Sequence, residues 1–137
     1  MNQRIARHIH VTCAIVERDG LILAAQRSAT MNQPLKWEFP GGKIDPGETP
    51  EACLQRELME ELAVAVSVCA PLQPVTHSYP DCTVTLYPFI CTIEGGELIL
   101  NEHAAVRWLK PEELPNLDWA AADLPVVHNY LRVKSEG

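Results

Sequence analysis

Residues 41–64 read GGKIDPGETPEACLQRELMEELAV, and this stretch decides how the rest of the chain is interpreted. Thr49, Pro50 and Glu51 form a helix start, because threonine accepts a free N–H of the first turn, proline presets the helical φ, and an acid suits the positive end of the helix dipole. The pattern predicts a helix that ends at about Leu62, preceded by a loop rich in proline and glycine.

One face of this predicted helix is strongly acidic. At about 100° per residue, the leucines share one arc, and the opposite arc carries Arg56, Glu57, Glu60 and Glu61. Like charges three and four residues apart repel and cost a helix a few tenths of a kcal/mol per pair. Either this face is solvated, or its carboxylates bind a hard divalent cation that removes the repulsion.

The loop before the helix favours the cation site. Gly41 and Gly42 allow the backbone to approach a ligand closely, and Glu48 adds a carboxylate just before the helix. The run is not a P-loop, because Ile44 occupies the position of the P-loop serine or threonine and the spaced first glycine is missing. A site made of carboxylates and backbone groups is therefore expected.

Together these residues resemble the Nudix box, Gly-x5-Glu-x7-Arg-Glu-U-x-Glu-Glu-x-Gly-U, in which U is aliphatic. Gly42, Glu48 and the run from Arg56 to Glu61 match it at the same spacing. Ala63 stands where the box has glycine, which puts the end of the helix in question, because glycine there permits a left-handed residue. The similarity reaches the MutT-like branch of the family through Trp37-Glu38-Phe39-Pro40-Gly41-Gly42-Lys43, Tyr79-Pro80-Asp81, Glu102 and Ala122-Asp123-Leu124-Pro125-Val126.

The resemblance implies a metal-dependent hydrolase of nucleoside triphosphates. The metal ligands that it implies, for Mg²⁺ or Mn²⁺, are Glu57, Glu60, Glu61, Glu102 and the carbonyl of Gly41. Glu57 and Glu60 would act in catalysis, with Arg56 and Glu48 holding the carboxylates in place. The expected reaction converts a triphosphate and water into a nucleoside monophosphate and pyrophosphate. Divalent ions would let a triphosphate approach a protein of net charge -7.

The resemblance is less decisive about the base. It places Arg27, Phe39, Asp81 and Asp123 near the nucleobase, and the remaining candidate substrate contacts are Gly42, Lys43 and Trp119. Cys82 stands where 8-oxoguanine-specific members have arginine, and Asp123 where they have asparagine. An ionised Asp123 accepts from the amine of cytosine but cannot donate, which favours (d)CTP and its 5-substituted forms. Two alternatives stay open: Asp123 only caps a helix, or a protonated Asp123 binds 8-oxo-dGTP.

The rest of the chain predicts an α+β fold. Alternating apolar residues around Asp19-Gly20 predict a hairpin of residues 8–18 and 21–25. Residues 28–49 are expected to be loop apart from 35–39. Antiparallel strands are predicted at 63–69, 75–78, 83–93, 98–100 and 105–109, with turns at 79–81 and 94–97. A helical turn is predicted at 111–114 and a closing helix at 123–133. With the resemblance, this describes one Nudix-like domain over residues 1–137, a mixed sheet with helices on both sides (an α/β/α sandwich).

Composition narrows the functional classes. The chain has 137 residues, 18 acidic against 11 basic, which makes duplex nucleic acid an unlikely partner. Five cysteines without a Cys-x-x-Cys pair favour reduced thiols and a cytoplasmic protein, and no apolar run approaches the ~20 residues of a membrane span. A monomer and a homodimer are both compatible with the sequence. The competing functions are another Nudix substrate (a dinucleoside polyphosphate, ADP-ribose or capped RNA) and a non-catalytic nucleotide-binding module, which has no reason to keep a self-repelling cluster.

Overall fold

A tight hairpin begins the fold. The computed structural model describes residues 7–136, in which β1 (Arg7–Arg18) and β2 (Leu21–Gln26) pair in the register Arg18↔Leu21. Asp19 and Gly20 between them have φ of 53° and 76°, which is the backbone of the two-residue turns that match the twist of paired strands. The predicted hairpin is confirmed.

The sheet is mixed. Its main path runs β3 (Trp37–Glu38), β2, β1, β7 (Cys82–Gly96), β5 (Val64–Pro71). Three strands pair beside this path: β4 (Gly41–Lys43) on β1, β6 (Val75–Ser78) on β7, and β8 (Ala105–Leu109) on β2. β7 pairs antiparallel with β5 and with β6, as predicted. β1 and β7 run parallel from Arg7↔Cys82 to Val16↔Cys91, a pairing that the sequence did not predict. A parallel pair needs a long crossover, and here the whole segment from β2 to β6 supplies it.

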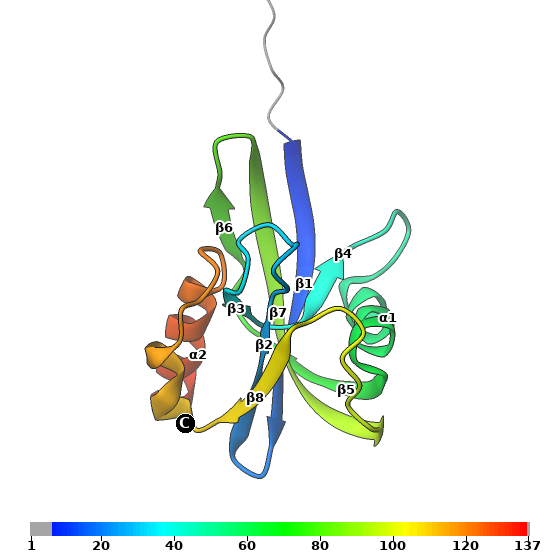
Figure 1. The fold of residues 1–137 in the computed structure, drawn as a ribbon, viewed down its shortest axis with the longest axis vertical. Helices are drawn as coiled ribbons and strands as arrows, with labels where there is room; N and C mark the ends of the chain where they lie inside the picture. The colour runs from blue at the N-terminus through cyan, green and yellow to red at the C-terminus, as the bar shows by residue number, and fades with distance from the viewer. Residues whose placement is uncertain (1–6, 137) are drawn as a thin grey trace, which may run out of the picture.

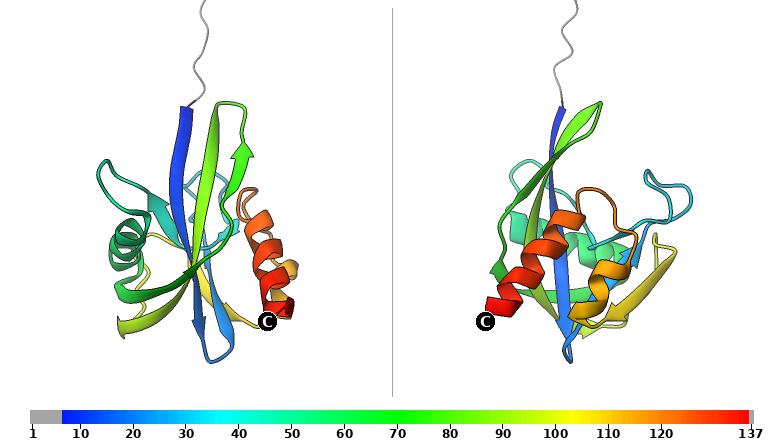
Figure 2. Two further views of the ribbon diagram at one scale, coloured as in Figure 1. Left: turned by 180° about the vertical axis from the view of Figure 1, so that it is seen from behind. Right: turned by 90° about the vertical axis from the view of Figure 1, so that its left-hand side faces the viewer.

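The two long helices cover opposite sides of the sheet (Figure 1, Figure 2). α1 (Pro50–Leu62) lies on one side, and α2 (Leu124–Glu136), with the short 3-10 helix η1 (Pro111–Asn116), lies on the other. Alternate residues of β1 serve the two layers: Ala14 and Val16 share a core with the leucines of α1, and Cys13 and Ile15 share one with Tyr130 of α2. The predicted sandwich is confirmed.

Three local predictions differ from the structure. Residues 41–43, expected to be loop, form β4 on β1. Residues 94–96, expected to begin a turn, extend β7 along β5 to the pair Val64↔Gly96. Residues 98–100 form no strand, because the Ile99 N–H bonds instead to the carbonyl of Leu62 at 3.0 Å. In each case a partner from a distant part of the chain decides the local structure.

α1 begins and ends where the sequence predicts. The side chain of Thr49 accepts the Ala52 N–H, and Ala63 closes the helix in the left-handed region at φ 59°, ψ 31°. A non-glycine residue in that region costs roughly 1–2 kcal/mol. The substitution of Ala63 for glycine therefore leaves the helix end in place at a modest cost.

Among the residues that the structure describes, no helix is long and apolar enough to cross a bilayer.

Candidate active site

The strand β4 connects the sheet to α1. A Cβ on Gly41 would lie 2.0 Å from the carbonyl oxygen of Thr12, and a Cβ on Gly42 would lie 2.3 Å from the carboxylate carbon of Glu57. The sequence predicted that these glycines open the backbone to a ligand. In the structure they first permit the close approach of β4 to β1 and of the Glu57 carboxylate to β4, so their small size sets the position of the acidic helix.

Arg56 organises the carboxylates around it. Its Nε and Nη2 bond the two oxygens of Glu48 at 2.7 and 2.9 Å, and its Nη1 bonds Glu57 Oε1 at 2.9 Å and Glu60 Oε2 at 3.2 Å. The hydrogen bonds from Arg56, with the N–H of Asp45, lower the pKa of Glu48 to about 2. Glu48 is therefore a fixed anion that anchors the guanidinium, and the guanidinium in turn holds Glu57 and Glu60, as the resemblance implied.

Glu61 is a buried carboxyl group whose ionised form is unfavourable. Glu61 is only 7% exposed, and its Oε2 is buried without a hydrogen-bond partner among the described residues. Burial, followed by the charges of Glu38, Glu57 and Glu102, raises the pKa of Glu61 to about 9. Burial also raises the pKa of Glu57. A cation at this position would satisfy the unpaired oxygen and remove the repulsion.

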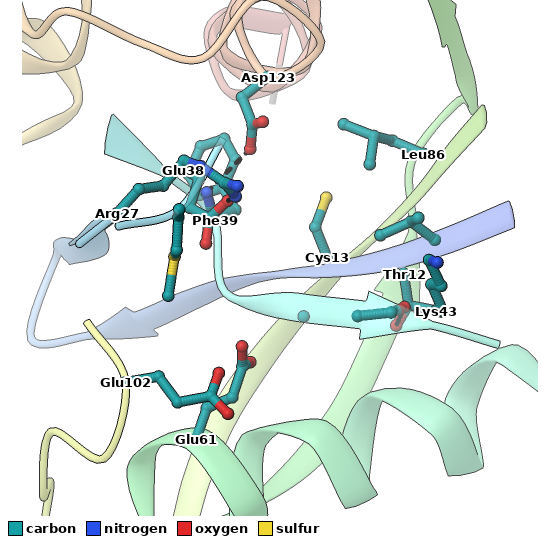
Figure 3. A pocket seen from close by; sticks show the side chains of 14 residues that line it. Thr12, Cys13, Arg27, Glu38, Phe39, Lys43, Glu61, Leu86, Glu102 and Asp123 are labelled. Carbon is teal, nitrogen blue, oxygen red and sulfur yellow. Dashed lines mark hydrogen bonds and ion pairs between the residues drawn. The ribbon is translucent and has the colours of Figure 1, made fainter. Parts of the chain in front are cut away.

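The donor set fits a hard divalent ion. Glu61 and Glu102 face each other at one end of a pocket (Figure 3). Gly41 also lines this pocket, and its backbone forms a hydrogen bond with Glu61. Within residues 7–136, however, no three side chains of His, Cys, Asp or Glu already converge as a metal-binding group. Glu57 is turned toward Arg56, and Glu60, whose side chain is 58% exposed, is too. Glu61 and Glu102 could hold Mg²⁺ or Mn²⁺ from this pocket, and Glu57 and Glu60 could join them by turning away from Arg56.

The pocket, of about 260 Å³, leads from these carboxylates toward the N-terminus of α2. Its lining is Val11, Thr12, Cys13, Arg27, Met31, Glu38, Phe39, Gly41, Gly42, Lys43, Glu61, Leu86, Glu102 and Asp123. Five of the predicted substrate contacts are thus brought together: Arg27, Phe39, Gly42, Lys43 and Asp123. Two are not. Asp81 lies on the exposed turn between β6 and β7, and Trp119 is buried behind Phe39, with ring centroids 4.8 Å apart.

Asp123 lies at the far end of the pocket. It is 6% exposed, and its Oδ2 accepts the Phe39 N–H at 2.9 Å. Burial, and then the charge of Glu38, raises the pKa of Asp123 to about 8. At neutral pH the carboxyl is therefore mostly protonated, and it can donate as well as accept a hydrogen bond. Of the two protonation states that the sequence analysis considered for Asp123, the raised pKa favours the protonated one. The carboxyl oxygen Oδ2 caps Phe39, while the backbone carbonyl of Asp123 accepts the Val127 N–H of α2.

Sequence reasoning missed three residues of the site. Glu38 bonds Arg27 Nη1 at 2.6 Å and the Nε2 of His103 at 2.9 Å, and the His103 side chain is fully buried. Glu38 stands in the Trp37 to Lys43 stretch that carried the resemblance, so that stretch was the available signal. Cys13 also lines the pocket, and burial holds the pKa of its thiol well above the usual value, so that it stays neutral.

Known proteins resemble this chain in sequence and in fold. The NUDIX domain family model matches residues 6–130. The CTP pyrophosphohydrolase of Escherichia coli (strain K12) is 35% identical over 127 residues, which cover 93% of this chain and 94% of that protein. The 8-oxo-dGTP diphosphatase of Proteus vulgaris is 37% identical over 93 residues, 67% of this chain and 83% of that protein. The solution structure of the E. coli ORF135 protein has a TM-score of 0.84 at 34% identity, covering 96% of this chain and 94% of that one.

Proposed function

Because the chain belongs to the NUDIX domain family, we propose that it is a divalent-metal-dependent hydrolase that converts nucleoside triphosphates into nucleoside monophosphates and pyrophosphate. The observation that carries the proposal is that one pocket has two chemically different ends. One end, which we call the metal end, holds Glu61 and Glu102; the other, the base end, holds Phe39 and Asp123. A nucleotide fits this arrangement with its phosphates at the metal end and its base against Asp123.

The residues of the metal end suit phosphoryl chemistry. Mg²⁺ held there supplies positive charge to the phosphates and lowers the pKa of a bound water. Glu57, Glu60, Glu61 and Glu102 would provide its oxygen ligands. Arg56 and Glu48 keep the helix carboxylates in position. A glutamate of the cluster takes the proton of the attacking water, the new P–O bond forms, and the bond to pyrophosphate breaks. Lys43 adds positive charge along the phosphate path, whereas the charge of Arg27 is balanced by Glu38.

For the base, we propose cytidine nucleotides as the first substrate class. Asp123 is the carboxyl that lies against Phe39 at the base end, and its amine-accepting oxygens match the exocyclic amine of cytosine. The CTP pyrophosphohydrolase that the chain resembles over 93% of its length supports the same class.

A second candidate substrate is 8-oxo-dGTP. The observation that favours it is the raised pKa of Asp123, about 8, because a protonated carboxyl presents a donor and an acceptor together, as an asparagine does. The similarity to the 8-oxo-dGTP diphosphatase of Proteus vulgaris points the same way. A dinucleoside polyphosphate, ADP-ribose or capped RNA would need room for a second nucleoside beyond a pocket of about 260 Å³.

The decisive experiment is hydrolysis of a nucleotide panel with product identification. The panel contains dCTP, 5-methyl-dCTP, dTTP, dGTP and 8-oxo-dGTP, with ADP-ribose and a dinucleoside polyphosphate as outgroups. Monophosphate and pyrophosphate from a triphosphate support the proposal, and the highest kcat/KM assigns the base. Turnover confined to ADP-ribose or the dinucleoside polyphosphate, or binding without turnover, contradicts it.

The five free cysteines fit a reducing compartment, and we propose that the protein works in the cytoplasm.

A further inference from the structure

The segment between β7 and β8 carries Glu102 to the metal end, and both neighbours of Glu102 are tied to other elements. We propose that Asn101 and His103 are positioning residues, which hold the Glu102 carboxylate opposite Glu61 and so complete the metal end of the pocket. The catalytic consequence rests on the proposed function, but the positioning itself is a statement about metal binding.

Asn101 ties the segment to the end of α1. Its N–H donates to the carbonyl of Glu61 at 3.2 Å, and its Nδ2 donates to the carbonyl of Glu60 at 2.8 Å. Ile99 adds a third bond, to the carbonyl of Leu62 at 3.0 Å. The last carbonyls of a helix have no partner within it, so these bonds satisfy the end of α1 and fix the segment to it. The residue before Glu102 is thereby attached to the helix that carries Glu61.

His103 ties the same segment to the opposite wall of the pocket. Its Nε2 meets Glu38 Oε2 at 2.9 Å, and the other oxygen of Glu38 accepts from Arg27 at 2.6 Å. The next residue, Ala104, donates its N–H to the carbonyl of Gln26 in β2 at 2.9 Å. The chain is therefore held on both sides of Glu102, by α1 before it and by β2 and β3 after it.

Asn101, Glu102 and His103 differ in how far they are buried. Asn101 and Glu102 are exposed, whereas the His103 side chain is fully buried and its Nδ1 has no hydrogen-bond partner among the described residues. An unpaired buried nitrogen costs free energy that a leucine of similar size would not. The bond that His103 gains in return is the one to Glu38, at the wall of the pocket. This bond fixes the residue next to Glu102 to the wall of the pocket, which is the geometry that a positioning residue requires.

The test uses metal binding without nucleotide. We would measure Mn²⁺ affinity by electron paramagnetic resonance, together with kcat, KM and thermal unfolding, for His103→Leu, His103→Gln and Asn101→Ala. Loss of an outer hydrogen bond of this kind lowers metal affinity about 10- to 100-fold. We expect His103→Leu to weaken Mn²⁺ binding by at least about 10-fold and to lower kcat, with KM for the nucleotide nearly unchanged. His103→Gln can still donate to Glu38 and should recover most of the affinity. Asn101→Ala keeps its N–H bond to Glu61 and should show a smaller loss in the same direction.

Matched controls and contrary outcomes are available in the same chain. His128→Leu on the exposed side of α2 and Asn116→Ala in η1 make the same chemical changes away from the pocket, and should leave Mn²⁺ affinity as in the wild type. If His103→Leu and Asn101→Ala bind Mn²⁺ like these controls, the positioning role is overturned. If His103→Leu does not fold, His103→Gln and Asn101→Ala decide by the same comparison. Wild-type protein that binds Mn²⁺ but hydrolyses no triphosphate would contradict the proposed function and leave this inference standing.

Discussion

The two ends of the pocket are stabilised in different ways. The metal end holds Glu61 and Glu102, and beside it Arg56 makes ion pairs with four further carboxylates, those of Asp45, Glu48, Glu57 and Glu60. At the base end, one carboxyl group is buried among Phe39, Leu86 and Cys13 and keeps its proton to a pH of about 8. Without an ion Glu61 also holds a proton, because its pKa is about 9, and a divalent ion bound at the metal end would take the place of that proton. At the base end Asp123 stays neutral by protonation alone.

This difference separates what each end contributes. Charges held for an ion act on any triphosphate, since every nucleotide carries the same phosphates. A buried group that both donates and accepts hydrogen bonds discriminates between bases. Changes at the metal end should consequently affect the rate with all substrates, and changes at the base end should affect the ratio between substrates.

Metal removal should have the largest effect. With EDTA, hydrolysis of every triphosphate should fall to background, and Mg²⁺ or Mn²⁺ should restore it, because the carboxylates of the site cannot neutralise a triphosphate without a cation. Phosphate or pyrophosphate release measures the effect, and circular dichroism checks that the fold persists. Turnover that continues in EDTA would refute the assignment of the metal end.

Substitution of a helix carboxylate should come next. Glu57→Gln and Glu60→Gln should each lower kcat by at least about 100-fold for all substrates alike, as expected for loss of a metal ligand or proton acceptor. Glu51→Gln, an exposed first-turn carboxylate of the same helix, is the matched control and should leave kcat unchanged. The helix should not lose stability in the two active-site variants, since like-charge repulsion decreases. Near-normal rates would mean that this face of α1 is only solvated.

Base discrimination should change by a smaller factor and should depend on pH. Below pH 8 Asp123 is mostly protonated; above it the ionised carboxylate only accepts, so the kcat/KM ratio of CTP to UTP should rise as the pH passes about 8. One hydrogen bond is worth roughly 1–3 kcal/mol, or about 5- to 150-fold in that ratio. In Asp123→Asn the ratio should be independent of pH, while Asp118→Asn, at an exposed residue, should behave like the wild type. A flat wild-type ratio would show that Asp123 does not contact the base.

The final prediction concerns stability rather than catalysis. Folding raises the pKa of Asp123 from 3.8 to about 8, so the folded state holds a proton that the unfolded state has released between these values. The stabilisation is complete below about pH 4 and is lost as the pH rises through 8. In EDTA, wild-type protein should unfold at a lower urea concentration at pH 8 than at pH 5. Asp123→Asn should reduce this difference, and equal pH dependence in both proteins would contradict the raised pKa.

The sequence predicts the metal end much better than the base end. Arg56, Glu57, Glu60 and Glu61 lie on one helix, so their spacing alone brings them together, and the N-cap at Thr49 fixes where that helix starts. The hairpin is equally local. The base end is assembled from β1, β3, β7 and the residue before α2, and no short-range pattern reports such a meeting. The parallel pairing of β1 with β7, the strand β4 and the role of Cys13 were invisible for the same reason.

The sequence leaves a protonated Asp123 open as an alternative, but it does not predict the raised pKa. Its pKa depends on burial and on Glu38, which lies 85 positions earlier in the chain. Trp119 is the reverse case, because it lies close to Asp123 in the sequence and was expected in the pocket. In the structure its ring packs against Phe39, and its Nε1 donates to the carbonyl of Leu114 at 2.7 Å. Sequence distance is a poor guide wherever a loop turns back on itself.

The left-handed Ala63 has an evolutionary consequence. The signature of the family asks for glycine at this position, yet the backbone at φ 59° requires only a conformation, which alanine adopts at a cost of roughly 1–2 kcal/mol. Since most domains have a stability margin several times larger, such a drift is survivable as long as other contacts stay intact. A signature search that requires the glycine would therefore pass over this chain, although it keeps every acidic residue of the box at the same spacing.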